Sequence, residues 1–255
     1  MRTLVMTPTY DEGENIEDFL RRTRAAVPEA DILVVDDASP DGTADIAERV
    51  GAEVANVHVL RRSAKEGLGT AYRAGFGFAL AQGYDVVCYL DADLSHDPGA
   101  LPALLARFDA DDADLVVGSR YVPGGSIPSW TWLRRAVSRL GNEYARALLG
   151  MPVRDSTSGY RVYRASALRA IDYATTRADG YGFQIEMAYR IWSLGGRVSE
   201  SPIAFTDRVR GTSKMSFTIA GEALALVTWW AVRDRSRRIV GRLRGRRETV
   251  TAGRA

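Results

Sequence analysis

The sequence predicts an α/β fold in which helices cover both faces of a mostly parallel central sheet. Its first half alternates short apolar segments with longer segments of helical periodicity. The apolar segments are continuously hydrophobic, as expected for parallel strands that are buried on both faces. Clusters of acidic and turn-forming residues follow three of these segments, and ligands of such sheets bind beyond the carboxyl ends of the strands. We therefore expect a Rossmann-like sheet with its site at that edge.

The expected elements follow from the pattern of apolar residues and helix breakers. Strands of the first half are expected at residues 3–6, 32–35, 54–60, 86–90 and 115–117. The helices between them are expected at residues 16–27, 43–50, 70–81 and 101–108. This alternation ends near residue 122. Beyond it the pattern predicts helices at 132–149, 183–194 and 217–232, and strands at 162–163 and 198–205.

Length and composition favour one substantial folded domain. The chain has 255 residues, of which 46% are hydrophobic and 26% are charged. Its one cysteine, Cys88, excludes a disulfide framework and a cysteine-based zinc cluster within the chain, and an intracellular location is the simplest interpretation. No segment reaches the roughly 18 to 20 consecutive apolar residues of a transmembrane helix. We therefore expect no membrane span.

The strongest chemical signal is the sequence Asp91-Ala92-Asp93, which directly follows the apolar segment 86–90. A buried strand that ends in two carboxylates creates an oxygen-rich site, suited to Mg²⁺ or Mn²⁺ bound jointly with a diphosphate. The metal would neutralise charge on a departing nucleoside diphosphate. A turn or a helix cap is the alternative interpretation, because Asp favours both.

Two more acidic clusters accompany the first two expected strands. Residues 7–15 follow one strand, and residues 34–43 end and follow the other. An acidic pocket repels a nucleotide unless a cation is present, so the three clusters together favour a metal-dependent nucleotide site. For the second cluster, capping of the next helix by Asp41 and Thr43 is the alternative interpretation.

Three motifs together resemble the inverting glycosyltransferases of family 2, which have the GT-A fold. The motifs are PTYDEGEN at residues 8–15, VDDASPDG at 35–42 and DADLSH at 91–96. Within this family the chain is most similar to dolichol- and polyprenol-phosphate mannose synthases, over residues 1–214. This narrower likeness is supported by GSRY at 118–121 and RVRGTSK at 208–214.

The resemblance implies roles for individual residues. The metal would bind Asp91 and Asp93, with Ser95 standing where the family often has a glutamine ligand. Asp93 and Arg120 are expected to act most directly in catalysis. The acceptor phosphate is expected to bind Arg120, Arg134 and Ser138. The residues expected to bind the nucleotide-sugar are Pro8, Tyr10, Glu12, Asp37, Asp91, Asp93, Arg208 and Lys214.

The implied reaction is inverting transfer of mannose from GDP-mannose to a polyprenyl (dolichyl) phosphate, with Mg²⁺ or Mn²⁺ as cofactor. A phosphate acceptor already carries a nucleophilic oxyanion, so the site needs cations that hold two anions together rather than a strong base. Two alternatives remain. One is a transferase that moves glucose or an aminosugar from a UDP-sugar to the same acceptor class, and the other is a non-catalytic subunit that binds nucleotide-sugars.

The C-terminal region, residues 216–255, differs from the catalytic domain expected at residues 1–215. An apolar helix that contains Trp229-Trp230 precedes eight arginines and one acidic residue at positions 233–247, and without that segment the chain has a net charge of −5. Tryptophan and arginine favour an anionic membrane surface. We therefore expect a peripheral position at the cytoplasmic face of a membrane, with a separate membrane-anchoring subunit as a candidate partner.

The alternative for this region is a last helix that packs on the core, followed by a solubilising tail. Nucleic acid is not an expected partner, because no aromatic and basic platform accompanies the arginines.

Overall fold

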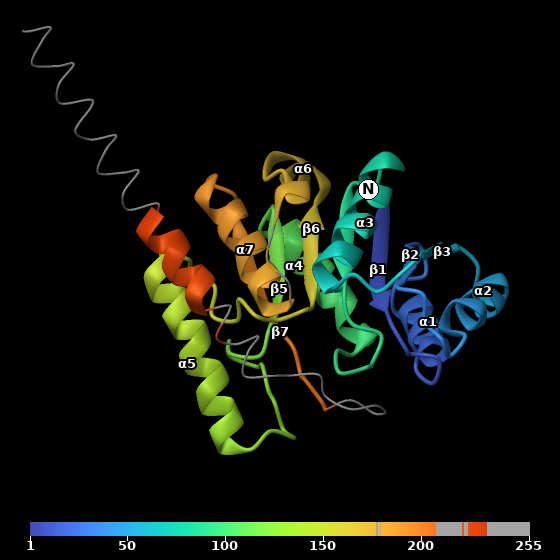
Figure 1. Cartoon of the computed structure of the whole chain (residues 1–255), viewed down its shortest axis with the longest axis horizontal. Helices are drawn as coiled ribbons and strands as arrows, with labels where there is room; N and C mark the ends of the chain where they lie inside the picture. The colour runs from blue at the N-terminus through green and yellow to red at the C-terminus, as the bar shows by residue number, and fades with distance from the viewer. Residues whose placement is uncertain (177, 179, 208–220, 222–223, 234–255) are drawn as a thin grey trace, which may run out of the picture.

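The computed structural model describes residues 1–176, 178, 180–207, 221 and 224–233 (Figure 1). The strands in this part of the chain are β1 (Thr3–Thr9), β2 (Asp31–Asp36), β3 (Val57–Arg61), β4 (Val86–Tyr89), β5 (Leu115–Ser119), β6 (Arg161–Arg164) and β7 (Val198–Pro202). The helices are α1 (Ile16–Ala26), α2 (Thr43–Val54), α3 (Leu68–Ala81), α4 (Leu101–Ala110), α5 (Trp132–Leu149), α6 (Ala165–Ala170) and α7 (Gly180–Ser193). Two 3₁₀ helices, η1 (Pro98–Ala100) and η2 (Tyr173–Thr175), complete the set.

The seven strands form one sheet in the order β3-β2-β1-β4-β6-β5-β7. Neighbours pair in parallel except at β6, which runs antiparallel to both β4 and β5. The carboxyl ends of β1, β2, β4 and β5 therefore lie at one edge. Because β6 begins at this same edge, the turn that precedes it, residues 155–160, lies beside the ends of β4 and β5. The mixed sheet thus brings a distant turn to the expected site.

Two hydrophobic cores occupy the two faces of the sheet. Side chains of β1 and β2 alternate between them, so that Met6 and Leu33 face the core under α3, α6 and α7. Val5 and Ile32 face the core under α1, α2 and α4. This alternation follows from the two-residue period of a strand, and it explains why these segments are apolar at every position.

The predicted architecture is confirmed, with corrections at element ends. Val54 to Asn56 were expected to begin a strand, but Val54 ends α2 and the next two residues turn through positive φ angles of 60° and 52°. β3 therefore starts only at Val57. The sequence did not predict α6 or either 3₁₀ helix, since these short elements have no recognisable periodicity. Helix α5 has the predicted bounds.

The last described segment, residues 224–233, is helical and lies beside α5 (Figure 1). Its inner side chains Val227 and Trp230 are buried in the core, and the Trp230 ring stacks on Tyr189 at a centroid distance of 6.4 Å. The part of the predicted helix before residue 221, and the arginines after Arg233, lie outside the described residues. Among the described helices, none has the length and apolar character to cross a membrane.

A cluster of aromatic rings packs under α3. Phe76 is fully buried and contacts five rings, at centroid distances of 5.6 to 6.5 Å for Tyr72, Tyr89, Tyr163, Tyr173 and Phe183. Phe76→Ala is expected to lower the free energy of unfolding by about 3 to 5 kcal/mol, because it leaves a cavity that these rings cannot fill. Urea denaturation measures this loss. The control is Leu194→Ala at a 64% exposed position, and equal losses in the two variants would contradict the assignment.

Candidate active site

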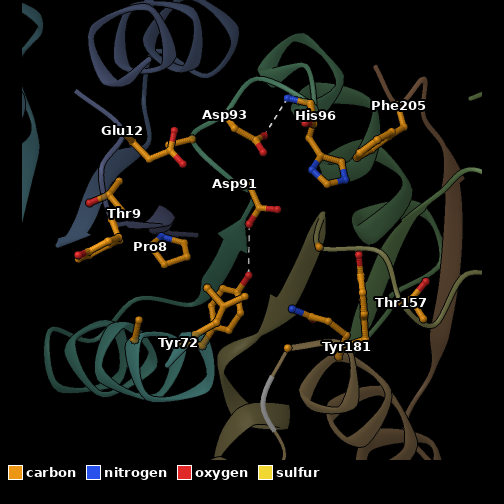
Figure 2. A pocket seen from close by; sticks show the side chains of 18 of the residues that line it. Pro8, Thr9, Glu12, Tyr72, Asp91, Asp93, His96, Thr157, Tyr181 and Phe205 are labelled. Atoms are coloured by element: carbon orange, nitrogen blue, oxygen red, sulfur yellow. Dashed lines mark hydrogen bonds between the residues drawn. The ribbon is translucent and has the colours of Figure 1, made fainter. Parts of the chain in front are cut away.

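A pocket of about 720 Å³ opens at the carboxyl edge of the sheet (Figure 2). Asp91 and Asp93 lie between Pro8 and Thr9 on one side and His96 and Phe205 on the other (Figure 2). The lining also includes Tyr10, Glu12, Asp37, Ser95, Arg120 and Arg134. Nine of the sequence-predicted site residues therefore line one cavity. They come from the ends of several strands and not from one strand alone.

The wall at the end of β1 carries an aromatic ring with a cation on its face. The ammonium group of Lys65 lies 3.6 Å from the centroid of the Tyr10 ring. Both residues line the pocket. A cation at this distance is attracted by the ring quadrupole, and it adds positive charge where an anionic ligand would bind. Sequence analysis missed Lys65, because a single lysine in a loop carries no recognisable signal.

The acids after β2 have separate functions. Asp37 lines the pocket, and its carboxylate contacts the Arg62 guanidinium at 2.5 Å. Burial raises the pKa of Asp37, although the charge of Arg62 opposes the shift. Asp36 is structural, because it accepts hydrogen bonds from the Thr9 hydroxyl and from Ser39.

Asp41 forms a hydrogen-bonded turn just before α2, whose N-cap residue is Gly42 and not Asp41 or Thr43. Its carboxylate accepts hydrogen bonds from the backbone N–H and the hydroxyl of Thr43, and from the backbone N–H of Gly13. These bonds hold the loop after β1 against the start of α2. Asp41 is absent from the pocket lining, and the bonds leave it a structural function among the described residues.

The loop after β4 delivers the two central carboxylates. Leu94 turns the chain at a positive φ of 59°, and this turn allows the backbone N–H of Ser95 to donate to Asp93 at 3.0 Å. Asp91 accepts a long hydrogen bond of 3.4 Å from the Tyr72 hydroxyl. A left-handed conformation at a non-glycine residue is costly, and it recurs at Asp11 in the loop after β1. The loops at this edge of the sheet therefore hold strained backbone conformations, which are common at functional sites.

His96 is the other notable group of this loop. Its side chain lines the pocket and is only 3% exposed, yet neither ring nitrogen has a hydrogen-bond partner among the described residues. Burial lowers the pKa of His96 to about 4, an effect that the nearby Asp93 carboxylate partly opposes. The imidazole is therefore neutral at pH 7 and can both donate and accept a hydrogen bond. Buried polar atoms without partners are rare, so these nitrogens are candidates for ligand contacts.

The turn before β6 closes the pocket opposite β1. Gly159 lies so near the carboxylates that a Cβ atom at this position would come within 3.4 Å of Asp91 Oδ2 and 3.8 Å of His96 Cε1. These are ordinary van der Waals distances, so the turn packs directly against Asp91 and His96.

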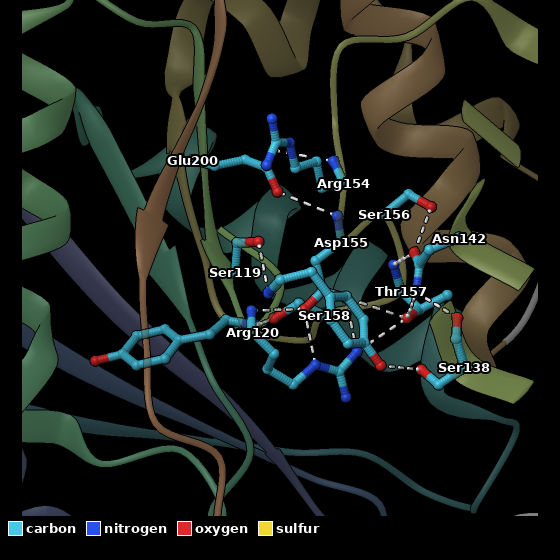
Figure 3. Close-up of polar contacts among 12 residues, drawn as sticks. Ser119, Arg120, Ser138, Asn142, Arg154, Asp155, Ser156, Thr157, Ser158 and Glu200 are labelled. Carbon is cyan, nitrogen blue, oxygen red and sulfur yellow. Dashed lines mark hydrogen bonds and ion pairs between the residues drawn. The ribbon is translucent and has the colours of Figure 1, made fainter. Parts of the chain in front are cut away.

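Arg120 is held by a buried ion pair (Figure 3). Its Nε and Nη2 atoms each donate to a different carboxylate oxygen of Asp155 at 2.7 Å, and Nη2 also donates to the Thr157 hydroxyl at 3.0 Å. Asp155 is fully buried and Arg120 is 7% exposed. Burial by itself lowers the pKa of Arg120, but the Asp155 carboxylate outweighs it and the pKa is raised. The guanidinium is thus a permanently charged and oriented group.

Asn142 of α5 and Glu200 of β7 fix the same turn (Figure 3). The Asn142 side chain accepts from the Ser156 hydroxyl and donates to the Thr157 hydroxyl. Glu200 accepts the backbone N–H of Asp155 at 3.1 Å, and burial raises the pKa of this glutamate. The partners of this turn come from remote segments, so no sequence pattern announces these contacts.

The predicted acceptor residues are only partly brought together. Arg134 lines the pocket, where its guanidinium lies 4.0 Å from the centroid of the Trp130 ring and 3.2 Å from Asp207. Ser138 does not line the pocket, and its hydroxyl accepts a hydrogen bond of 2.7 Å from Tyr121. Binding of an acceptor phosphate by Ser138 stays a prediction. Arg208 and Lys214 lie outside the described residues.

The residues present suit a hard divalent cation that shares its coordination with a ligand. Asp91 and Asp93 offer carboxylate oxygens, and Ser95 offers a hydroxyl at the same loop. In the described ranges no three His, Cys, Asp or Glu side chains are grouped to hold a metal by themselves. A cation here would therefore complete its coordination with oxygens of a bound molecule, as Mg²⁺ does with phosphates.

Removal of the Asp155 charge tests the ion pair. Asp155→Asn is expected to lower the free energy of unfolding by about 3 to 5 kcal/mol, because Arg120 is left as an uncompensated buried cation. Asp207→Asn is the matched control and is expected to cost less than about 1 kcal/mol, since its pair with Arg134 is half exposed. Denaturant unfolding of both variants provides the comparison. A small loss for Asp155→Asn would show that the pair does not stabilise the site.

The chain is similar in sequence to known proteins over most of its length. The family described as Glycosyl transferase family 2 matches residues 4–172. An undecaprenyl-phosphate mannosyltransferase of Micrococcus luteus is 51% identical over 235 residues, which cover 92% of this chain and 96% of the relative. A polyprenol monophosphomannose synthase of Mycolicibacterium smegmatis is 46% identical over 243 residues, which cover 94% of this chain and 91% of the relative.

Solved structures support the fold. Glucosyl-3-phosphoglycerate synthase of Mycobacterium tuberculosis, in complex with Mn²⁺, UDP and glucosyl-3-phosphoglycerate, has a TM-score of 0.66 at 18% identity. The match covers 89% of this chain and 78% of that one. The same enzyme in complex with Mg²⁺ and UDP has a TM-score of 0.65 at 18% identity, covering 89% and 78%. At such identity these likenesses support the GT-A fold alone. The family match and the two close relatives show that the chain belongs to glycosyl transferase family 2.

Proposed function

We propose that the chain transfers mannose from GDP-mannose to a polyprenyl phosphate, forming polyprenyl-phosphate mannose, with Mg²⁺ or Mn²⁺ as cofactor. The observation that carries the proposal is the pocket, where the carboxylates of Asp91 and Asp93 and the guanidinium groups of Arg120 and Arg134 line one cavity. The names of the two relatives, a mannosyltransferase for undecaprenyl phosphate and a polyprenol monophosphomannose synthase, support the sugar and the acceptor class.

The donor would bind along the ends of β1, β2 and β4. Pro8, Tyr10 and Glu12 would surround the nucleoside, with Asp37 as the acceptor for N–H groups of the base. A carboxylate suits guanine, which presents adjacent N–H donors. Arg208 and Lys214 remain proposed contacts of the donor diphosphate.

The metal would be held by Asp91, Asp93 and the hydroxyl of Ser95, and when bound it would offset the charge of the diphosphate. These carboxylates face the same cavity as Arg120 and Arg134. The protein therefore places the cation and the arginines where two anionic substrates must lie close together. Without these charges, repulsion would keep the two substrates apart.

The acceptor phosphate would bind Arg120 and Arg134, with Ser138 as a further candidate. An oxygen of this phosphate attacks the anomeric carbon of mannose, and the bond from that carbon to the β-phosphate oxygen breaks. GDP leaves with the electron pair, and the configuration at the anomeric carbon is inverted. Because Asp155 fixes the guanidinium plane of Arg120, the acceptor meets a preorganised cation.

The lipid acceptor implies that the enzyme acts as a peripheral protein at the cytoplasmic face of a membrane. The boundary between a catalytic domain at 1–215 and a membrane-associated region at 216–255 belongs to this proposal. The described helix 224–233 supports it in part, since Trp229 and Val232 are 56% and 60% exposed while the inner face packs on the core. A separate membrane-anchoring subunit remains a candidate partner.

Loss of one carboxylate tests the metal-dependent mechanism. Asp93→Asn is expected to lower the rate of radiolabelled mannose transfer into an organic-phase lipid by about 100-fold or more, because charge stabilisation at the leaving group is lost. Chelation with EDTA should have a similar effect, and added Mn²⁺ should restore the wild-type protein. The control is Asp109→Asn, an exposed acid on α4. Retained transfer by Asp93→Asn would place the active centre elsewhere.

A panel of donors separates GDP-mannose from a UDP-sugar. With Mn²⁺ present, GDP is expected to raise the melting temperature of the protein more than UDP at the same concentration, because a ligand that binds only the native state stabilises it more the more tightly it binds. Transfer from UDP-glucose or a UDP-aminosugar, but not from GDP-mannose, would favour the alternative transferase. Binding of nucleotide-sugars without any transfer would favour a non-catalytic subunit.

A further inference from the structure

Two arginines of the pocket approach the same tryptophan ring. Trp130 lines the pocket and is 6% exposed. The Cζ atom of Arg134 lies 4.0 Å from the centroid of the Trp130 ring, and the Cζ atom of Arg120 lies 5.4 Å from it. A guanidinium group within about 6 Å of an aromatic centroid is attracted by the ring quadrupole, and tryptophan attracts a cation more strongly than the other aromatic residues do. One buried side chain therefore attracts both cations of the expected acceptor site.

The Trp130 ring is itself held between two remote segments, the loop after β5 and the segment after β7. The backbone N–H of Ser126 donates to Ile203 at 3.0 Å, and the backbone N–H of Phe205 donates back to Ser126 at 2.9 Å. Further along, the Trp130 Nε1–H donates to the Asp207 carboxylate at 3.1 Å. The rings of Trp130 and Phe205 meet edge to face at a centroid distance of 5.6 Å. These contacts fix the orientation of the indole.

Arg134 depends on this ring more than on its ion pair. Its Nη1 atom donates to Asp207 Oδ1 at 3.2 Å, the same oxygen that accepts the Trp130 Nε1–H. The side chains of this ion pair are 34% and 49% exposed, so water weakens the attraction between the two charges. The contact with the buried ring is shielded from water on the side of the indole. Trp130 is therefore the better-defined support of the Arg134 guanidinium.

Arg120 keeps one terminal nitrogen for a ligand. Its Nε and Nη2 atoms donate to the turn before β6, whereas Nη1 makes no hydrogen bond with the described residues (Figure 3). Three aromatic rings, those of Tyr121, Trp130 and Phe205, lie 5.4 to 5.5 Å from the Arg120 Cζ atom. Rings at this distance limit the access of water to the guanidinium group. A charge-assisted hydrogen bond from Nη1 to a phosphate oxygen gains strength where water is limited.

We propose that Trp130 is a positioning residue for the acceptor, because its ring holds the guanidinium groups of Arg120 and Arg134 where both can contact one phosphate group. Two guanidinium groups repel each other, and their attraction to a shared ring offsets part of this repulsion before the phosphate binds. A neutral ring orients the arginines and leaves their full charge for the ligand, whereas a carboxylate would compete with the phosphate. The inference rests on the proposed function for the identity of the acceptor.

The first test measures binding of farnesyl phosphate to the full chain by calorimetry, without a sugar donor. Trp130→Leu is expected to weaken this binding about tenfold, because both cation–π contacts are lost. Binding of GDP with Mn²⁺ should stay at the wild-type affinity, and a loss there as large as the loss for farnesyl phosphate would overturn the proposal. Trp192→Leu is the matched control on α7, at a 38% exposed position outside the pocket, and should bind both ligands as the wild type does.

A second test keeps the shape of the side chain, so it also serves if Trp130→Leu does not fold. Tetrafluorotryptophan at position 130 retains the ring and the indole N–H, but the fluorine atoms withdraw electron density from the ring face. The affinity for farnesyl phosphate is expected to fall about fivefold, because the quadrupole that attracts the arginines is weakened. The same replacement at position 192 is the control. Wild-type affinity with the fluorinated residue at position 130 would show that the ring acts only by its volume, and the proposal would be wrong.

A double-mutant cycle tests whether Trp130 acts through the arginines. In the Arg134→Leu background, Trp130→Leu is expected to weaken binding of farnesyl phosphate by about threefold or less, since only the contact with Arg120 remains to be lost. In the wild-type background the same change costs about tenfold. Equal losses in the two backgrounds would mean that Trp130 and Arg134 act independently, which contradicts a positioning function.

Transfer assays separate this proposal from the proposed function. With farnesyl phosphate as acceptor, Trp130→Leu is expected to raise the KM of the acceptor about tenfold and to leave the KM of GDP-mannose unchanged. If the wild type binds farnesyl phosphate with the expected dependence on Trp130 but transfers no mannose, the proposed function is wrong and the positioning function stands. If the wild type transfers mannose and Trp130→Leu has an unchanged KM for the acceptor, the positioning function is wrong and the proposed function stands.

Discussion

The ion pair between Arg120 and Asp155 is the contact on which the arrangement of the pocket depends. It joins the loop after β5 to the turn before β6, 35 residues later in the chain. That turn brings Gly159 against Asp91 and carries Thr157, so the pair sets the wall that faces the carboxylates of Asp91 and Asp93. A buried pair of this kind contributes little net stability, yet removal of one partner is costly. Here the ion pair fixes the Arg120 guanidinium in one orientation.

The pocket separates its charges by origin. The acids come from loops after parallel strands β1, β2 and β4, where the chain leaves the sheet in turns that favour aspartate. Arg120 directly follows β5, and Arg134 lies in the first turn of α5, after the regular alternation has ended. The parallel half of the sheet thus supplies carboxylates suited to a cation, and the less regular half supplies guanidinium groups suited to an anion.

The sequence predicted the acidic side of the site well because that side is local. Asp91 and Asp93 end a continuously apolar segment, and parallel strand ends always converge. The other side depends on contacts that no pattern announces. Asp155 reaches Arg120 only because β6 runs antiparallel between β4 and β5, a reversal that the short apolar segment at 162–163 does not reveal. His96 ends the motif at 91–96, but its burial without a hydrogen-bond partner among the described residues is a property of the folded chain that no sequence pattern reveals.

For helix α5, the sequence predicted the helix but not which of its side chains point inward. Its bounds were predicted correctly, yet a periodic pattern gives only the existence of an apolar face and not the side on which it lies. The core under this helix is narrow and accepts Asn142, whose amide holds Ser156 and Thr157, so the polar residue faces inward. The larger apolar side chains are thereby left outside, at a cost in exposed surface that a monomer in water does not recover. The inner face therefore combines the buried apolar residues Ala145 and Leu149 with the hydrogen-bonded Asn142, so hydrophobicity alone does not tell which face of this helix is buried.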